Sequence, residues 1–198
     1  MKTFMLALLL LTTTAASGQD NSVVLRLASS QFSGESASIE GEESLPLSLS
    51  SNAGYGIGFT HQFSPRFSAA FDVMRLRPDV KADVGGIALD GGTLSLTPLT
   101  AIARVHGRYV YAGAGLAYVM TGDLRSADLD SDGVGGVSVD NDVTYVLNAG
   151  VSVPAGKSLH IDFDARYFPA EADATTTAGR GRLKFNSLLL GVGLGWRF

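Results

Sequence analysis

Apolar and polar residues alternate with a period of two along most of the chain, which predicts β-strands rather than helices. The alternation is clearest over residues 188–198, where one face is wholly apolar and the other is mostly glycine. In residues 94–105, Pro98 cannot donate to a ladder, so we expect a bulge and a change of phase there. The other alternating segments are residues 22–30, 55–63, 67–74, 109–119, 143–153 and 159–168.

The connections between these segments alternate in length. Those at residues 64–66, 106–108 and 154–158 are short, and the others are much longer. In an antiparallel sheet, all short turns and both termini then lie at one end and all long loops at the other. This pattern is typical of an all-β fold, the eight-stranded antiparallel transmembrane β-barrel of the outer membrane, with periplasmic turns and extracellular loops. We expect residues 19–198 to form this single domain.

A soluble exported β-sandwich would alternate in the same way, because one face would be core and the other solvent. Two features favour the barrel. The charged face is rich in glycine, as expected inside a narrow barrel. Aromatic residues lie near strand ends, as in an interfacial girdle. They are Tyr55, Phe63, Phe67, Tyr145, Tyr167, Trp196 and Phe198.

Residues 1–18 have the pattern of a secretory signal peptide. Lys2 precedes an apolar core of about eight residues, and Ala16 and Gly18 are small residues suited to cleavage after Gly18. That core is far shorter than the ~20 residues of a membrane helix. We therefore expect Sec-type export and a location in the outer membrane of a diderm bacterium.

The composition supports an exported membrane protein. The chain has no cysteine, so no disulfide stabilises it. Charged residues make up 17%, below the ~25% typical of soluble domains. The net charge of −4 argues against a nucleic-acid partner.

The chain resembles the OmpW family of small outer-membrane barrels. The stretches that carry the resemblance are "LSLTPLTAIARVHGRYVYAGAGLAYV", "LHIDFDARYFPAEADATTT" and "LLLGVGLGWRF". The resemblance implies a non-enzymatic eight-stranded barrel that passes small hydrophobic molecules through a narrow apolar lumen and out sideways. It implies no catalytic residues and no cofactor.

The last strand is expected to pair with the first, because a closed barrel leaves no unpaired edge in lipid. Its end also resembles the C-terminal assembly signal of outer-membrane barrels, with Gly193, Trp196 and Phe198 at the matching positions. That resemblance implies the barrel-assembly machinery and outer-membrane lipid as partners.

The alternation places six charged residues on inward faces. Charges in so narrow a lumen must pair or stay hydrated. A plug of salt bridges that rigidifies the barrel and a gated polar path both fit this pattern. The six residues are Arg26, Asp72, Asp162, Asp164, Arg166 and Arg197.

Two further patterns indicate chemistry only weakly. Asp128, Asp130 and Asp132 begin like a calcium loop, but Val139 stands where a bidentate glutamate belongs. A solvated acidic loop fits better than a weak extracellular Ca²⁺ site, and we assign no metal site. A lipid-modifying barrel enzyme needs a His–Ser pair near the outer rim. The three histidines, His61, His106 and His160, all lie near the short-turn end, so we expect no enzyme.

Two functions remain open. One is the passive binding or transfer of small hydrophobic solutes, with Phe168 and Leu189 lining an apolar pocket above the charges. The other is a structural or interaction barrel that presents acidic extracellular loops and transports nothing. A wide aqueous channel is excluded, because water-filled porins need ~16–18 strands.

Overall fold

The computed structural model describes residues 21–39, 45–84, 87–122, 138–176 and 179–198. The predicted signal peptide lies outside the described residues. Within them, no helix is long and apolar enough to cross a membrane.

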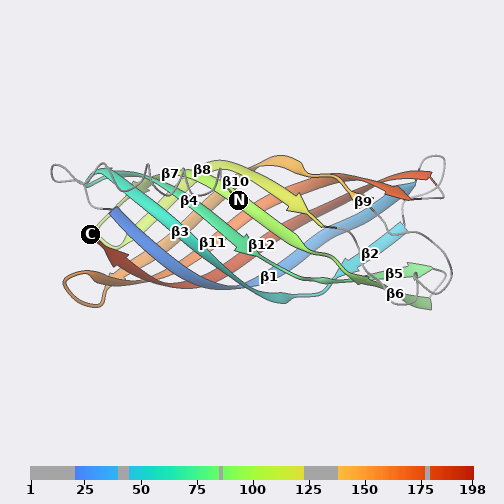
Figure 1. The fold of residues 1–198 in the computed structure, drawn as a ribbon, viewed down its shortest axis with the longest axis horizontal. Coiled ribbons are helices and arrows are strands. Elements are labelled where there is room, and N and C mark those ends of the chain that lie inside the picture. Colours follow the sequence, from blue (N-terminus) through green and yellow to red (C-terminus); the bar gives the residue numbers. More distant parts are fainter. Residues whose placement is uncertain (1–20, 40–44, 85–86, 123–137, 177–178) are drawn as a thin grey trace, which may run out of the picture.

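Eight long antiparallel strands form a closed barrel (Figure 1), which confirms the predicted fold class. Each strand pairs with the next around the wall, and the last pairs with the first. In wall order they are β1 (Asn21–Ile39), β3 (Asn52–Ser64), β4 (Phe67–Arg75), β7 (Leu96–His106), β8 (Val110–Thr121), β10 (Asp142–Pro154), β11 (Leu159–Thr176) and β12 (Gly179–Arg197).

The β1–β12 ladder closes the barrel from end to end. It runs from Ser22↔Arg197 to Ile39↔Gly181, with one register shift between Ser33 and Ser36. Gly34 lies inside that shift with a backbone φ of +65°, a conformation that residues other than glycine rarely adopt. Asn21 and Phe198 exchange backbone hydrogen bonds of 3.2 and 2.9 Å. The chain therefore stays paired to its final residue, as a lipid environment requires.

The two faces of the wall match the alternation in the sequence. Leu27 is 65% exposed on the outside, while its neighbour Ala28 is 7% exposed in the lumen. Exposed apolar side chains cover the outside, where they contact lipid. They include Leu25, Ile57, Phe71, Val105, Leu116, Tyr145, Phe163, Leu190, Trp196 and Phe198.

The expected bulge at Pro98 is wrong. The β7–β8 register is continuous from Leu96↔Thr121 to His106↔Tyr111. Leu96 exchanges hydrogen bonds of 2.9 and 3.0 Å with Leu76, just beyond β4. Pro98, two residues after Leu96, therefore turns its ring nitrogen toward β4. The ladder between β4 and β7 lacks a single hydrogen-bond donor as a result. The phase does not change, so Arg104 also faces the lumen.

In their described parts, the long connections contain four short strands that the alternation did not predict. They are β2 (Leu45–Leu49), β5 (Asp79–Val84), β6 (Ile87–Thr93) and β9 (Ser138–Val139). β2 pairs with β1 and with β5, β5 pairs with β6, and β9 pairs with β11. These strands satisfy backbone groups where β1 and β11 extend past the membrane. The short turns, residues 65–66, 107–109 and 155–158, lie at the opposite end.

Single-cysteine labelling tests this orientation, because the chain has no cysteine of its own. Asp140 is exposed at the long-loop end, and Gly156 is in a short turn with open space around its Cα. A membrane-impermeant maleimide is expected to label Asp140→Cys but not Gly156→Cys in intact cells. Both should react after the cells are broken. Labelling of Gly156→Cys in sealed cells would reverse the topology.

Deletion of Phe198 is expected to impair assembly. The residue is 60% exposed on the lipid face, and its backbone completes the β1–β12 ladder. Heat-modifiable migration on a gel measures the folded fraction in the outer membrane. Phe198→Ala, which keeps the backbone pair and removes the ring, separates the two contributions. Normal levels of heat-modifiable protein after deletion would contradict the assembly role.

Candidate functional site

A layer of buried ion pairs crosses the lumen. Asp72 Oδ1 on β4 accepts a hydrogen bond from Arg26 Nε at 2.9 Å and lies 3.0 Å from Arg166 Nη2. Asp164 lies 2.8 Å from Arg166 Nε and 3.3 Å from Arg26 Nη1. Asp162 lies 3.5 Å from Arg26 Nη2. These side chains are at most 5% exposed. The structure thus brings together five of the six inward charges, and we call them, with Arg104, the charged layer.

Arg104 is the member that the sequence reasoning missed. Its Nε donates to Asn148 Oδ1 at 2.8 Å, and its Nη2 lies 4.0 Å from Asp72 Oδ2. Asn148 in turn donates to Ala165 O at 3.1 Å. Uninterrupted alternation through Pro98 would have placed Arg104 on the lumen face. The complete layer has three arginines and three aspartates, so its formal charges cancel.

Close packing of the charged layer requires a glycine on the neighbouring strand β3, where Gly58 pairs with Asp72. A Cβ atom on Gly58 would collide with the Asp72 carboxylate. The glycine therefore lets Asp72 lie against the wall, which leaves the centre of the lumen to the guanidinium groups. This agrees with the rule that eight strands enclose just enough space for side chains.

Arg197 does not join the charged layer, which corrects its predicted place in the plug. It pairs with Ser22 at the periplasmic end of the wall, whereas Asp162 pairs with Gly193 farther up β12. Its side chain is exposed at that rim. The alternation gave the correct face but not the height along the barrel.

Above the charged layer most buried lumenal side chains are apolar, although Ser30 and Ser187 are buried there as well. Phe168 and Leu189 are 1% and 2% exposed and belong to one apolar cluster. Leu189 pairs with Arg166, so the cluster begins level with the upper edge of the charged layer. Phe32 contacts Phe185 edge-on at 5.8 Å between ring centroids. Further members are Met74, Leu76, Leu94, Leu96, Ile102, Val119, Val146, Ala170 and Leu183.

The wall between β10 and β11 is incomplete in its extracellular half. Their register runs from Pro154↔His160 to Leu147↔Tyr167 and stops. β10 continues to pair with β8, and β11 continues to pair with β12. We call residues 142–146 and 168–172 the seam. It holds a cavity of about 370 Å³ lined by Gly34, Asp142, Val143, Thr144, Pro169, Ala170, Glu171, Lys184, Phe185 and Asn186.

Pro169 accounts for the break. Glu171, two residues on, donates its backbone N–H across the seam to Asp142 Oδ2 at 2.9 Å. Pro169 therefore turns its ring nitrogen, which has no hydrogen, toward β10. Ala170 and Phe185 line the seam cavity and also belong to the apolar cluster. The seam cavity therefore borders buried residues of the apolar cluster and exposed residues of the outer wall, and half of its lining residues are polar or charged, among them Asp142, Glu171 and Lys184.

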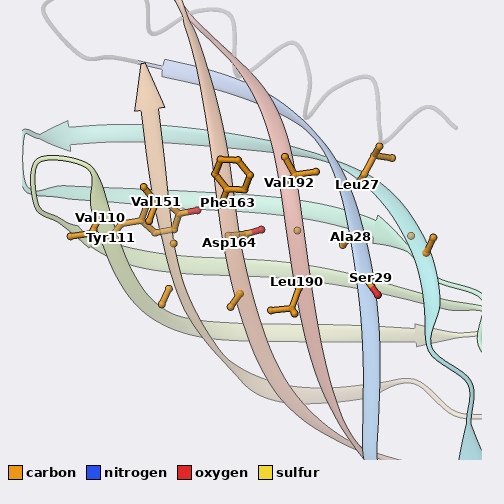
Figure 2. A pocket seen from close by; sticks show the side chains of 16 residues that line it. Leu27, Ala28, Ser29, Val110, Tyr111, Val151, Phe163, Asp164, Leu190 and Val192 are labelled. Atoms are coloured by element: carbon orange, nitrogen blue, oxygen red, sulfur yellow. The ribbon is translucent and has the colours of Figure 1, made fainter. Parts of the chain in front are cut away.

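A second hollow, of about 960 Å³, is lined mainly by outward-facing residues of the wall, together with the buried residues Ala28, Tyr111 and Asp164. Figure 2 shows Leu27, Phe163, Leu190 and Val192 among the side chains that line it. Between these larger groups lie small residues, Ser29, Ala53, Ala149 and Ala165. In an outer-membrane barrel this shallow depression contacts lipid, and we assign it no solute.

The remaining sequence candidates are the histidines and the acidic loop. His106 Nε2 lies 2.7 Å from Ser68 Oγ, and His160 Nε2 lies 3.7 Å from Asp162 Oδ1, both near the periplasmic end. Asp128, Asp130 and Asp132 lie outside the described residues. Among the described residues, no cluster has ligands suited to a metal ion.

The sequence matches the OmpW family over residues 25–198. OprG from Pseudomonas aeruginosa is 14% identical, with a TM-score of 0.78 over 90% of this chain and 95% of that chain. AlkL in DMPC lipid bilayers is 15% identical, with a TM-score of 0.66 over 93% and 94%. E. coli Outer Membrane Protein W is 16% identical, with a TM-score of 0.55 over 90% and 98%. These similarities show the fold. No curated protein matches the chain.

Replacing Asp72 with Asn is expected to destabilise the barrel by about 3–5 kcal/mol, because it leaves buried arginines without their counter-charge. Reversible urea unfolding in lipid vesicles measures the free energy. The matched control is Asp173→Asn, which removes an exposed partner of Arg182, 3.0 Å away, and should change stability little. Equal effects of the two substitutions would contradict a structural role for the charged layer.

Proposed function

The chain belongs to the OmpW family of outer-membrane barrels, and we propose that it transfers small hydrophobic solutes passively, without a cofactor or an energy input. The proposal extends what the family resemblance implies to the geometry of this chain. Such transfer also requires a path along which a solute can move from the apolar lumen into the surrounding lipid.

The charged layer argues against a straight path through the barrel. A solute that crossed it would separate Asp72 from Arg26 and Arg166, which lie 2.9 and 3.0 Å away. Breaking a buried ion pair costs about 3–5 kcal/mol. In the upper lumen an apolar solute would only exchange one set of apolar contacts for another. We therefore infer that solute enters from the extracellular end and stops above Leu189 and Arg166.

The seam supplies a sideways exit, and it is the observation that carries the proposal. Its cavity touches Phe185 inside the barrel and Val143, which is 64% exposed, on the outer wall. The ladder is already interrupted there, so passage breaks few backbone hydrogen bonds. An exit at Pro169 would deliver an apolar solute into the outer part of the membrane.

Cross-linking the seam tests the route. Val143→Cys and Glu171→Cys place two thiols on opposite edges of the seam, both on the exposed outer face. Joining them with a short, reducible dithiol-specific reagent is expected to lower the uptake of N-phenyl-1-naphthylamine by cells to the level without the protein. Reduction should restore uptake, which excludes misfolding as the cause.

The matched control joins Val143→Cys to Tyr118→Cys, two residues that already face each other across the closed β8–β10 ladder. This cross-link should leave uptake unchanged. Equal uptake with and without the protein would instead support the structural or interaction barrel. Uptake that depends on the protein but not on the seam would move the exit elsewhere.

A further inference from the structure

The periplasmic end of the lumen holds a second site, unrelated to the apolar route. Below the charged layer lies a polar cavity of about 240 Å³, which we call the vestibule. Strands on all sides of the barrel contribute to it. Its lining includes Arg104, Arg108, Tyr111, His160, Asp162 and Arg197.

Arg104 and Tyr111 are fixed in the vestibule, and each has a polar atom without a hydrogen-bond partner among the described residues. The Arg104 guanidinium is fixed by Asn148 and stacks 4.6 Å from the centre of the Tyr111 ring. Tyr111 is 5% exposed, yet its Oη has no hydrogen-bond partner among the described residues. The same holds for Arg104 Nη2 and His160 Nδ1. A buried donor without an acceptor costs about 1–3 kcal/mol, so these groups favour an acceptor nearby.

The vestibule also carries excess positive charge. The arginines and aspartates of the charged layer cancel, which leaves Arg108 and Arg197, for which the described residues supply no ion-pair partner. Asp162 is the one carboxylate among the described residues of the lining, and Arg26 and His160 lie 3.5 and 3.7 Å from it. The lining thus holds three arginines and one aspartate, so its excess positive charge and the phenolic donor of Tyr111 favour an anion over a cation.

We propose that the vestibule binds a small phosphate-type oxyanion from the periplasmic side. Tyr111 Oη donates to it from the wall, and the guanidinium of Arg197 closes over it from the rim. Hydrogen bonds to a charged acceptor are about twice as strong as neutral ones, which suits a compact, highly charged ligand. The inference goes beyond hydrophobic transfer and does not rest on it, because the seam lies at the other end of the barrel.

Isothermal titration of the folded protein with inorganic phosphate tests the site. The protein is kept in octyl glucoside, a detergent that carries neither charge nor phosphate. We expect one phosphate per barrel. Arg197→Gln should raise the Kd by about tenfold, and Tyr111→Phe by about threefold or more, as expected for charge-assisted hydrogen bonds. Heat-modifiable migration confirms that each variant is folded.

Arg182→Gln is the matched control, because Arg182 is an exposed arginine at the extracellular end. It removes the same charge and should leave the Kd unchanged. An equal rise for Arg182→Gln and Arg197→Gln would mean attraction by net charge alone and would overturn the site. No binding at millimolar phosphate would also overturn it.

A second titration, with sn-glycerol 3-phosphate, identifies the source of the oxyanion. Tighter binding than that of inorganic phosphate points to a phospholipid headgroup of the periplasmic leaflet. Weaker binding points to free phosphate. Both results support the oxyanion site, and they differ only in which molecule supplies the oxyanion.

Discussion

The structure depends on how three arginines are neutralised inside a barrel only wide enough for side chains. Asp72 is central, since Arg26, Arg104 and Arg166 all lie within 4.0 Å of its carboxylate. Removal of one partner would leave buried charge that neither lipid nor protein can solvate. The aspartates on β11 complete the neutralisation by pairing with Arg26 on β1, and Arg166 on β11 reaches across the lumen to Asp72 on β4. The charged layer thus ties strands together across the lumen and divides it into two compartments.

The position of the seam follows from what a membrane allows. An unpaired backbone group in hydrocarbon costs several kcal/mol, so a ladder can open only where water or headgroups reach it. Tyr145 and Tyr167, whose ring centroids are 6.5 Å apart, lie at the lower end of the seam, as aromatic residues do at a membrane interface. Asp142 then satisfies the Glu171 N–H with a side-chain oxygen. Pro169 is tolerated at this height, whereas beside Phe163 it would expose backbone to lipid.

Alternation predicted the wall well, because lipid outside and a narrow lumen inside allow few exceptions. The lumen was predicted less completely. Arg104 was missed because a single Pro98 cast doubt on the phase of its strand, and Arg197 was misplaced because alternation does not report height. The seam was unpredictable for another reason. Pro169 lacks a hydrogen-bond donor on either its β10 side or its β12 side. Which side it is depends on the register of β11 with both neighbours, and the sequence of β11 alone does not give that register. The strands within the long connections pair with β1 and β11 beyond the membrane, where alternation is weaker.

The final strand shows how one short sequence meets two demands at once. Its outward residues are apolar up to Phe198, since they face lipid. Its inward glycines leave space for side chains of the charged layer and the vestibule. A Cβ on Gly191 would lie 2.6 Å from Asp164 Oδ1, and one on Gly195 would collide with His160. The alternation of glycine with bulky apolar residues therefore reflects lumenal packing as much as membrane insertion. A larger residue at Gly191 would displace Asp164 from Arg166 while leaving the lipid face intact, so the charged layer would fail before the wall did.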